Sequence, residues 1–243
     1  MLDGLVIQSH KGPYTVSFTK NLLEDGKRLL EGQVHCIIDA NIKRLYGDKM
    51  GEVFDHPNTI LVNATEEAKS IDQIIPVIHR LVDDGVRRDH VLVAIGGGIV
   101  QDITCFISST LLRGVPWKFV PTTLLAQADS CIGSKSSINL GAIKNILGTF
   151  NPPREIIVNT EFLNTLEHSE MRSGFGELLK VHAIEGRQSF DHLAADYDCL
   201  LSDRDLLLGY VRNALLIKQK YIELDEFDRN VRNIFNYGHS FGH

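Results

Sequence analysis

A glycine-rich segment, AIGGGIVQD at residues 94–102, is the first of four that could carry chemistry. An apolar run of strand type leads into three glycines and then into a helical pattern. This order places free backbone amides at the start of a helix, where N–H groups and the helix dipole stabilise a phosphate. A tight turn between a strand and a helix is the alternative, since the segment is not a full GxGxxG motif.

The second segment, residues 120–153, is dense in small polar residues and contains Lys135, Lys144 and Asn145. Lysine supplies charge and asparagine supplies directional donors, which suits a phosphate or a polyhydroxylated substrate. We expect a long loop here, and loops of this length inside compact domains are usually functional. A solvated surface loop with incidental lysines is the alternative.

The third segment, RSGFGELLKVH at residues 172–182, places Glu177 and Lys180 three residues apart. This spacing puts both side chains on one face of a helix, so a surface ion pair explains them. The flanking Gly176 and the apolar residues 178–179 favour a half-buried carboxylate instead. Such a carboxylate needs a cation or a metal.

The fourth segment is NYGHSFGH at residues 236–243, in which His239 and His243 are four residues apart. Histidines at this spacing share a helix face, as in metal-binding helices. Surface or core histidines are the alternative. Glu177, His239 and one further ligand would complete a set for Zn²⁺.

Composition limits the class of protein. The 243 residues, 43% hydrophobic and 23% charged, allow one large domain or two modest ones. The net charge of −6, with both signs interspersed, argues against nucleic-acid binding. No apolar run approaches the roughly 18–20 residues of a membrane span, and no signal peptide is evident, so we expect a cytoplasmic protein. The cysteines are far apart in apolar stretches, so we expect buried free thiols at Cys36, Cys105, Cys131 and Cys199.

The elements that must position these segments change character along the chain. We expect strands at residues 4–8, 14–18, 34–39, 59–62, 90–95 and 117–120. Helical patterns lie between them at residues 42–48, 71–82 (with a kink at Pro76) and 100–112. Alternation of this kind predicts a parallel α/β sheet. After about residue 160 the patterns are helical, at residues 162–166, 171–184, 206–224 and just before 236. We therefore predict an α/β domain at residues 1–153 and an all-helical domain at residues 154–243.

Together these segments resemble the 3-dehydroquinate synthase family, the NAD- and metal-dependent sugar phosphate cyclases. The resemblance runs from about residue 34 to residue 243. Its motifs are GGGIVQD (96–102), LLRGVPW (111–117), VPTTLLAQADSCIGSK (120–135), KNILGTFNPP (144–153), GELLK (176–180) and RNIFNYGHSFGH (232–243). The resemblance implies a Rossmann-like domain for NAD and a helical domain for metal and substrate. It also implies that the helical domain is incomplete here, with a third metal ligand expected beyond residue 243.

The resemblance also implies the site residues. The positions that match cofactor contacts are Asp39, Asn41, Glu66, Lys69, Gly97, Gly98, Asp102, Thr122, Thr123, Leu125, Asp129 and Lys144. Those that match catalytic or substrate contacts are Arg113, Lys135, Lys144, Asn145, Lys180, Lys218, Arg232, Asn236 and His243. Two of the three metal ligands match Glu177 and His239, so His243 is expected to face substrate.

The implied activity is that of a phosphate-eliminating carbon–oxygen lyase. The expected reaction converts 3-deoxy-arabino-heptulosonate 7-phosphate to 3-dehydroquinate in the shikimate pathway of aromatic amino acid biosynthesis. NAD⁺ takes a hydride from a ring hydroxyl, phosphate leaves, the hydride returns and an aldol step closes the carbocycle. NAD is therefore not consumed, and Zn²⁺ or Co²⁺ polarises the oxygens. A homodimer is the expected assembly.

Three departures from the family pattern leave the sugar phosphate open. Gln101 replaces a usual glycine, SKSS at residues 134–137 stands for Gly-Lys-Thr-Gly, and Asp228 stands for glutamate. Arg232 and Asn236 favour a substrate with a carboxylate. The alternatives are a related cyclase such as 2-deoxy-scyllo-inosose synthase, an iron- or zinc-type NAD-dependent polyol dehydrogenase, and an inactive NAD-binding fragment. We expect these 243 residues alone to bind metal weakly and to show little turnover.

Overall fold

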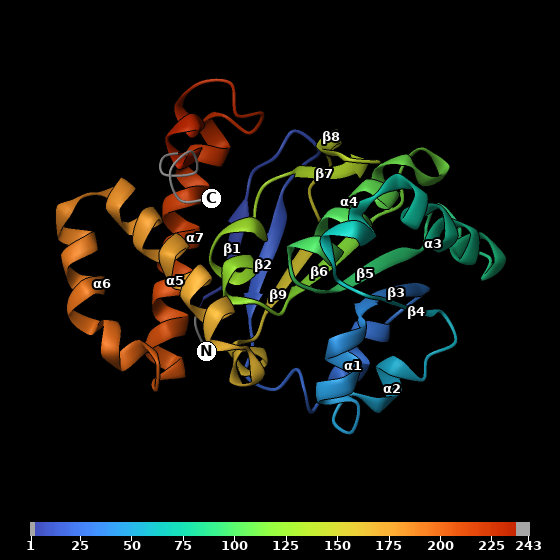
Figure 1. Ribbon diagram of the computed structural model, residues 1–243, viewed down its shortest axis with the longest axis horizontal. Helices are drawn as coiled ribbons and strands as arrows, with labels where there is room; N and C mark the ends of the chain where they lie inside the picture. The colour runs from blue at the N-terminus through green and yellow to red at the C-terminus, as the bar shows by residue number, and fades with distance from the viewer. Residues whose placement is uncertain (1–2, 237–243) are drawn as a thin grey trace.

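A seven-stranded sheet with the order β1-β2-β9-β6-β5-β3-β4 forms the centre of the computed structural model, which describes residues 3–236 (Figure 1). Its strands are β1 (Leu5–Ile7), β2 (Tyr14–Phe18), β3 (Val34–Asp39), β4 (Thr59–Val62), β5 (Val91–Gly96), β6 (Trp117–Pro121) and β9 (Glu155–Val158). Neighbouring strands are parallel, except that β1 is antiparallel to β2. The predicted strands and the predicted parallel sheet are confirmed.

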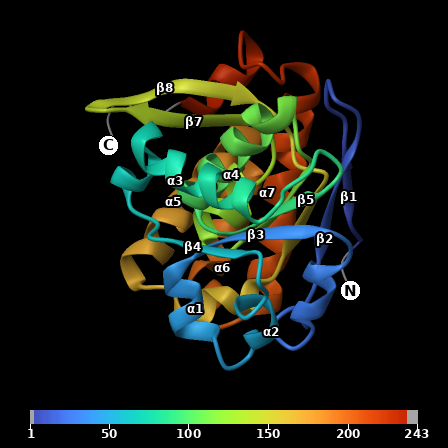
Figure 2. The ribbon, with the colours of Figure 1, turned by 90° about the vertical axis from the view of Figure 1, so that its right-hand side faces the viewer.

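Helices cover both faces of this sheet, which explains why its central strands are mostly apolar. Along β3, Ile37 packs with α3 (Ile71–Asp83) and α4 (Gly98–Thr110) on one face. The next residue, Ile38, packs with α1 (Ala40–Tyr46) and α2 (Gly51–Phe54) on the other. Pro76 lies inside α3, where the sequence predicts a kink. Figure 2 shows these layers, with α3 and α4 above the sheet and α1 and α2 below it.

A β-hairpin lies across α4, where the sequence predicts a long loop. Its strands β7 (Lys135–Leu140) and β8 (Ile143–Phe150) pair antiparallel as a separate two-stranded sheet. Ser136 and Ile138 are buried on the α4 side, while the two serines of β7, Ser136 and Ser137, have little intrinsic preference for strands. The long-loop prediction is therefore wrong, because packing on α4 and pairing between β7 and β8 stabilise the hairpin.

The remainder of the described chain is helical after β9. It consists of short 3₁₀ turns at Thr160–Thr165 and Val231–Asn236 and the helices α5 (His168–Glu185), α6 (Arg187–Leu200) and α7 (Arg204–Leu224). Helix α6 was not predicted, because only Leu193 and Leu200 are fully buried in it and its apolar period is weak. Within residues 3–236, no helix is long and apolar enough to cross a membrane.

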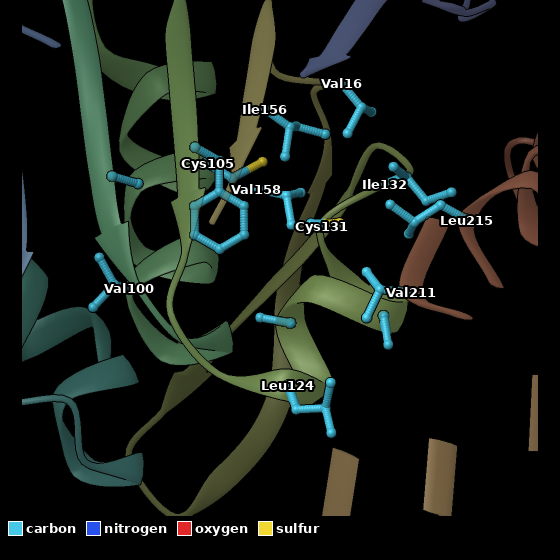
Figure 3. Close-up of a cluster of buried hydrophobic side chains, with 14 of the residues drawn as sticks. Val16, Val100, Cys105, Leu124, Cys131, Ile132, Ile156, Val158, Val211 and Leu215 are labelled. Carbon is cyan, nitrogen blue, oxygen red and sulfur yellow. The ribbon is translucent and has the colours of Figure 1, made fainter. Parts of the chain in front are cut away.

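One buried apolar cluster joins the sheet to the helices (Figure 3). It runs from Val158 on β9 through Leu124 and Ile132 to Val211 and Leu215 on α7. Strand β9 itself follows the boundary predicted at residue 153, so the sheet uses residues beyond it. The division of the chain into two domains stays a prediction.

The cysteines are free thiols. Burial raises the pKa of Cys36 and of Cys131 to about 12, and that of Cys105 to about 11. The expectation of four buried thiols is wrong for Cys199, which is exposed on α6.

Candidate active site

The glycine turn joins the end of β5 to the start of α4. A Cβ added at Gly96 would lie 2.6 Å from Val100 Cγ2, and one at Gly97 would lie 3.0 Å from Thr123 Cγ2. A Cβ at Gly98 would meet nothing within 4 Å, so the space beside the first amides of α4 is open. No side chain caps this helix start. The turn therefore fits a phosphate group held by backbone N–H donors.

A buried polar network lies one turn further along α4. Asp102 forms an ion pair of 2.7 Å with Lys69, whose side chain is 8% exposed. Lys69 Nζ also donates to Asn145 Oδ1 at 3.0 Å, and Ser137 N donates to Asp102 Oδ1 at 3.2 Å. Burial raises the pKa of Asp102, and the Lys69 charge opposes that rise. Two predicted cofactor residues thus lie beside the predicted substrate residue Asn145, which the hairpin supplies in a left-handed conformation with φ of 53°.

The residues predicted for the adenosine side lie near this network and the glycine turn. Asp39 ends β3 and caps α1, because its Oδ1 accepts from Asn41 N at 2.9 Å. Burial raises the pKa of Asp39, and the Asn41 hydrogen bonds oppose the rise. A Cβ at Gly96 would lie 3.4 Å from Asp39 Cβ, so this carboxylate is next to the glycine turn. Glu66 Oε1 accepts from Asn139 Nδ2 at 2.9 Å, which links it to the hairpin.

A second buried ion pair connects the sheet region to the helices. Asp129 lies in a π-helical turn, Ala126–Ser130, that follows β6. Its carboxylate is 2.8 Å from Nζ of Lys218 on α7, and Lys218 also donates to the Asp129 carbonyl oxygen. Burial acts to raise the pKa of Asp129, but the Lys218 charge holds it below its usual value. The pair therefore keeps two charged groups inside the protein.

A pocket of about 210 Å³ is lined by predicted residues from the glycine turn and α4 and by both members of the Asp129–Lys218 pair. The predicted residues that line it are Gly98, Asp102, Asp129, Lys135, Lys218 and Arg232. Lys135 forms an ion pair with Asp228, while Arg232 is buried and donates through Nη1 to the Glu226 carbonyl oxygen at 2.7 Å. A Cβ at Gly133 would lie 2.9 Å from Arg232 Nη2, so a side chain at this position would displace the guanidinium group. Three cationic side chains thus converge beside the start of α4.

Two acidic residues that the sequence interpretation missed position Arg232. The Asp225 carboxylate accepts the backbone N–H of Arg232 at 3.2 Å. Glu226 binds the β1–β2 turn, since Ser9 Oγ donates to it at 2.6 Å and His10 N at 2.8 Å. Burial acts to raise the pKa of Glu226, but these hydrogen bonds hold it below its usual value. The acidic run at residues 225–228 was the available sequence signal.

The predicted metal ligands are only partly described. Glu177 Oε2 and Lys180 Nζ form a half-buried ion pair of 2.6 Å on α5, as their spacing suggested. His239 and His243 lie outside the described residues. Among residues 3–236, no group of three or more His, Cys, Asp or Glu side chains could hold a metal ion. The metal set stays a prediction.

Several other predicted residues do not line this pocket. Arg113, Lys144 and Asn236 are exposed. Thr122 is buried, and its N–H donates to the Gly96 carbonyl at 2.9 Å. The remaining two predicted cofactor contacts, Thr123 and Leu125, lie at the start of the π-helical turn.

Comparison of the sequence with protein-family models identifies the family of this chain. A family model for the N-terminal part of 3-dehydroquinate synthase matches residues 59–173, and one for the C-terminal part matches residues 174–243. The chain belongs to the 3-dehydroquinate synthase family. The 3-dehydroquinate synthase of Thermoanaerobacter pseudethanolicus is 34% identical over 89% of this chain, and that of Acidithiobacillus ferrooxidans is 37% identical over 88%. The chain spans 62% and 60% of the lengths of these curated relatives.

Solved structures confirm the predicted family fold. The 2-epi-5-epi-valiolone synthase of Streptomyces hygroscopicus, with NAD⁺ and Zn²⁺ bound, matches 94% of this chain and 66% of its own with a TM-score of 0.84 and 28% identity. A 2-deoxy-scyllo-inosose synthase matches 99% of this chain and 69% of its own with a TM-score of 0.82 and 22% identity. An iron-containing alcohol dehydrogenase of Thermotoga maritima shares the fold less closely, covering 86% of this chain and 67% of its own with a TM-score of 0.62 and 18% identity. The parallel sheet followed by helices is therefore the fold of the sugar phosphate cyclases.

Proposed function

We propose that this chain is part of a sugar phosphate cyclase that converts 3-deoxy-arabino-heptulosonate 7-phosphate to 3-dehydroquinate, a step of the shikimate pathway. The proposal rests on one observation: Lys135, Lys218 and Arg232 converge in a pocket that begins at Gly98. A substrate with a phosphate and a carboxylate needs such partners. The chain has a net charge of −6, so only a local cluster can provide them. The curated relatives named 3-dehydroquinate synthase support this substrate.

The described residues fit the cofactor that the family implies. The pyrophosphate of NAD would lie on the first amides of α4, where Gly98 leaves open space. Asp39, at the carboxyl end of β3, would bind a ribose hydroxyl. Glu177 and His239 would hold the divalent metal. When bound, NAD⁺ supplies a hydride acceptor that returns its hydride, and the metal supplies a Lewis acid.

The cationic side chains would act on the substrate itself. Lys135 would bind the phosphate and exchange its present partner, Asp228, for that group. Arg232 would bind the carboxylate, because a planar guanidinium can donate two parallel hydrogen bonds to it. Lys218 stays charged beside Asp129 and would stabilise negative charge that develops during phosphate elimination. In these roles the hairpin binds the phosphate end of the substrate through Lys135, and the segment at residues 225–232 binds the carboxylate end through Arg232.

The test is phosphate release by the purified chain, with NAD⁺ and Zn²⁺ or Co²⁺ added after dialysis against EDTA. We expect slow, metal-dependent release from the heptulosonate phosphate without net accumulation of NADH, since the hydride returns to the intermediate. Undiminished turnover in EDTA would refute the proposal. Phosphate release from glucose 6-phosphate alone would favour a 2-deoxy-scyllo-inosose synthase. Net NADH formation with a simple polyol would favour a dehydrogenase, and NAD⁺ binding without turnover would favour an inactive fragment.

A pair of lysine variants separates the pocket from general charge effects. Lys135→Met should lower kcat/KM about 10- to 100-fold, the loss expected when one charge-assisted hydrogen bond to a bound phosphate is removed. Lys27→Met is the matched control, because Lys27 also forms an ion pair, with Glu52 at 2.8 Å, but is 72% exposed and does not line the pocket. Equal effects of the two variants would contradict the assigned role of Lys135.

A further inference from the structure

Gln101 joins α4 to the π-helical turn through a reciprocal pair of hydrogen bonds. Its side chain is buried in the first turn of α4, with only 6% of the residue exposed. Gln101 Nε2 donates to the Ser130 carbonyl oxygen at 2.6 Å, and Ser130 Oγ donates to Gln101 Oε1 at 2.7 Å. Both ends of the amide are therefore used for this one connection.

The connection acts on the part of the turn that carries Asp129. Ser130 ends the π-helical turn, where the carbonyl groups lack partners within the helix. π-Helical turns are rare and are frequently found at functional sites. Asp129, the preceding residue, holds Lys218 of α7 through its carboxylate and its carbonyl oxygen. A bond to Ser130 therefore restricts the backbone that positions the Asp129–Lys218 pair.

A second glutamine fixes the same turn to the sheet. Gln127 Nε2 donates to the carbonyl oxygens of Pro121 at 3.0 Å and Asn159 at 2.9 Å, at the ends of β6 and β9. Gln127 thus fixes the middle of the turn, and Gln101 fixes its end against α4. Gln101, Gly98 and Asp129 all line the same pocket. Gln101 therefore links α4, whose first amides are open, directly to the end of the turn that carries Asp129.

We propose that Gln101 is a positioning residue that holds the Asp129 turn at a set distance from the glycine turn and so preforms the cofactor site. This inference rests on the proposed function, because it takes NAD as the ligand of the glycine turn. Gln101 is neutral and its amide is already bonded at both ends, so it acts through Ser130 and exchanges no proton. A preformed site binds more tightly because less ordering is needed when the ligand arrives.

Calorimetric titration with NAD⁺ and hydrogen exchange on the whole chain test the inference. Gln101→Ala removes both hydrogen bonds and should weaken NAD⁺ binding about 5- to 10-fold, the range expected for bonds of this kind. It should also speed amide exchange in residues 124–133 and leave exchange in β3 and β4 unchanged. Ser130→Ala keeps the bond to its own carbonyl and should have a smaller effect. In the Gln101→Ala background, Ser130→Ala should add nothing, because its partner is already absent.

Gln188→Ala is the matched control, since Gln188 is an exposed glutamine in the first turn of α6. The inference is overturned if Gln101→Ala binds NAD⁺ within about twofold of this control, or if faster exchange spreads over the whole chain. Absence of NAD⁺ binding by the unsubstituted chain would overturn it as well. A chain that binds NAD⁺ but releases no phosphate would contradict the proposed function, while the Gln101 comparison would still decide this inference.

Discussion

Replacing Lys218 by methionine tests the buried pair that connects the sheet to α7. Methionine keeps most of the side-chain length and removes the charge, leaving Asp129 without the Nζ that lies 2.8 Å away. Removing one partner of a buried ion pair costs about 3–5 kcal/mol, because the other charge stays buried and unpaired. The Asp129 side chain keeps 23% of its surface exposed, which favours the lower end of that range. About 3 kcal/mol corresponds to a fall in Tm of roughly 6–12 °C for a chain of this size.

The loss should also depend on pH. In the unsubstituted chain, burial acts to raise the pKa of Asp129, but Lys218 holds it below its usual value. Lys218 makes the largest contribution that lowers this pKa; without it, only the smaller contributions of Lys180 and Arg232 oppose burial, and we expect the pKa to rise above the value of about 3.9 in the unfolded chain. The folded variant then binds the proton more tightly than the unfolded one, so its stability falls as pH rises through the raised pKa. We expect a larger loss at pH 7 than at pH 5.

Urea denaturation followed by circular dichroism at both pH values measures this loss. Lys220→Met is the matched control on the same helix, because Lys220 pairs with Glu185 at 2.6 Å but its side chain is 59% exposed. Exposed pairs contribute about 0–1 kcal/mol. Adding Asp129→Asn to Lys218→Met should recover stability, since no charge is then left buried. A loss no larger than that of Lys220→Met, or one that is the same at both pH values, would refute the reasoning.

Two further predictions concern packing and protonation. Gly174→Ala on α5 should lower the free energy of unfolding measured in urea, because its Cβ would lie 2.5 Å from Leu124 Cβ. At Gly176 on the same helix, a Cβ would meet nothing within 4 Å, so Gly176→Ala should stabilise the chain by about 1 kcal/mol through helix propensity. If Gly174→Ala proved more stable than Gly176→Ala, the packing of α5 would be contradicted. The free energy of unfolding should also fall between pH 7 and pH 5. Burial and the nearby His90 hold the pKa of His35 in the folded chain below its usual value. In the unfolded chain, His35 takes up a proton near the unperturbed pKa of about 6.5, so protonation favours unfolding. His35→Leu should reduce that slope, and an unchanged slope would show that His35 does not contribute to it.

Much of the sheet was predictable because local pattern and burial agree there. The run at residues 34–39 is mostly apolar, and the strand it forms, β3, is covered by helices on both faces. The glycine turn was predictable for a similar reason, since a Cβ at Gly96 would lie only 2.6 Å from Val100 Cγ2, within the same turn. In both places a residue type is required by immediate geometry.

The hairpin and α6 were not predictable in the same way. Ser136 has little preference for a strand, yet it is buried on the α4 side of the hairpin. Helix α6 has only two fully buried side chains, Leu193 and Leu200, so its apolar period is weak. In both elements the stabilising contacts come from distant parts of the chain, which local preferences do not report.

The residue types alone established the α/β plan, the amide-bearing turn and a supply of lysine, arginine and carboxylate for an anionic substrate. The partners of those charges were decided by the folded chain. Lys69 meets Asp102 because the 3₁₀ turn at Glu66–Lys69 packs against α4, and Lys218 meets Asp129 across 89 residues of sequence. Such pairs form only when sheet order and helix packing bring the segments together, because the free energy that does so comes from buried apolar contacts shared by the whole core. The sequence motifs thus indicate which chemical groups are available, and packing of the shared core determines which charged groups form pairs.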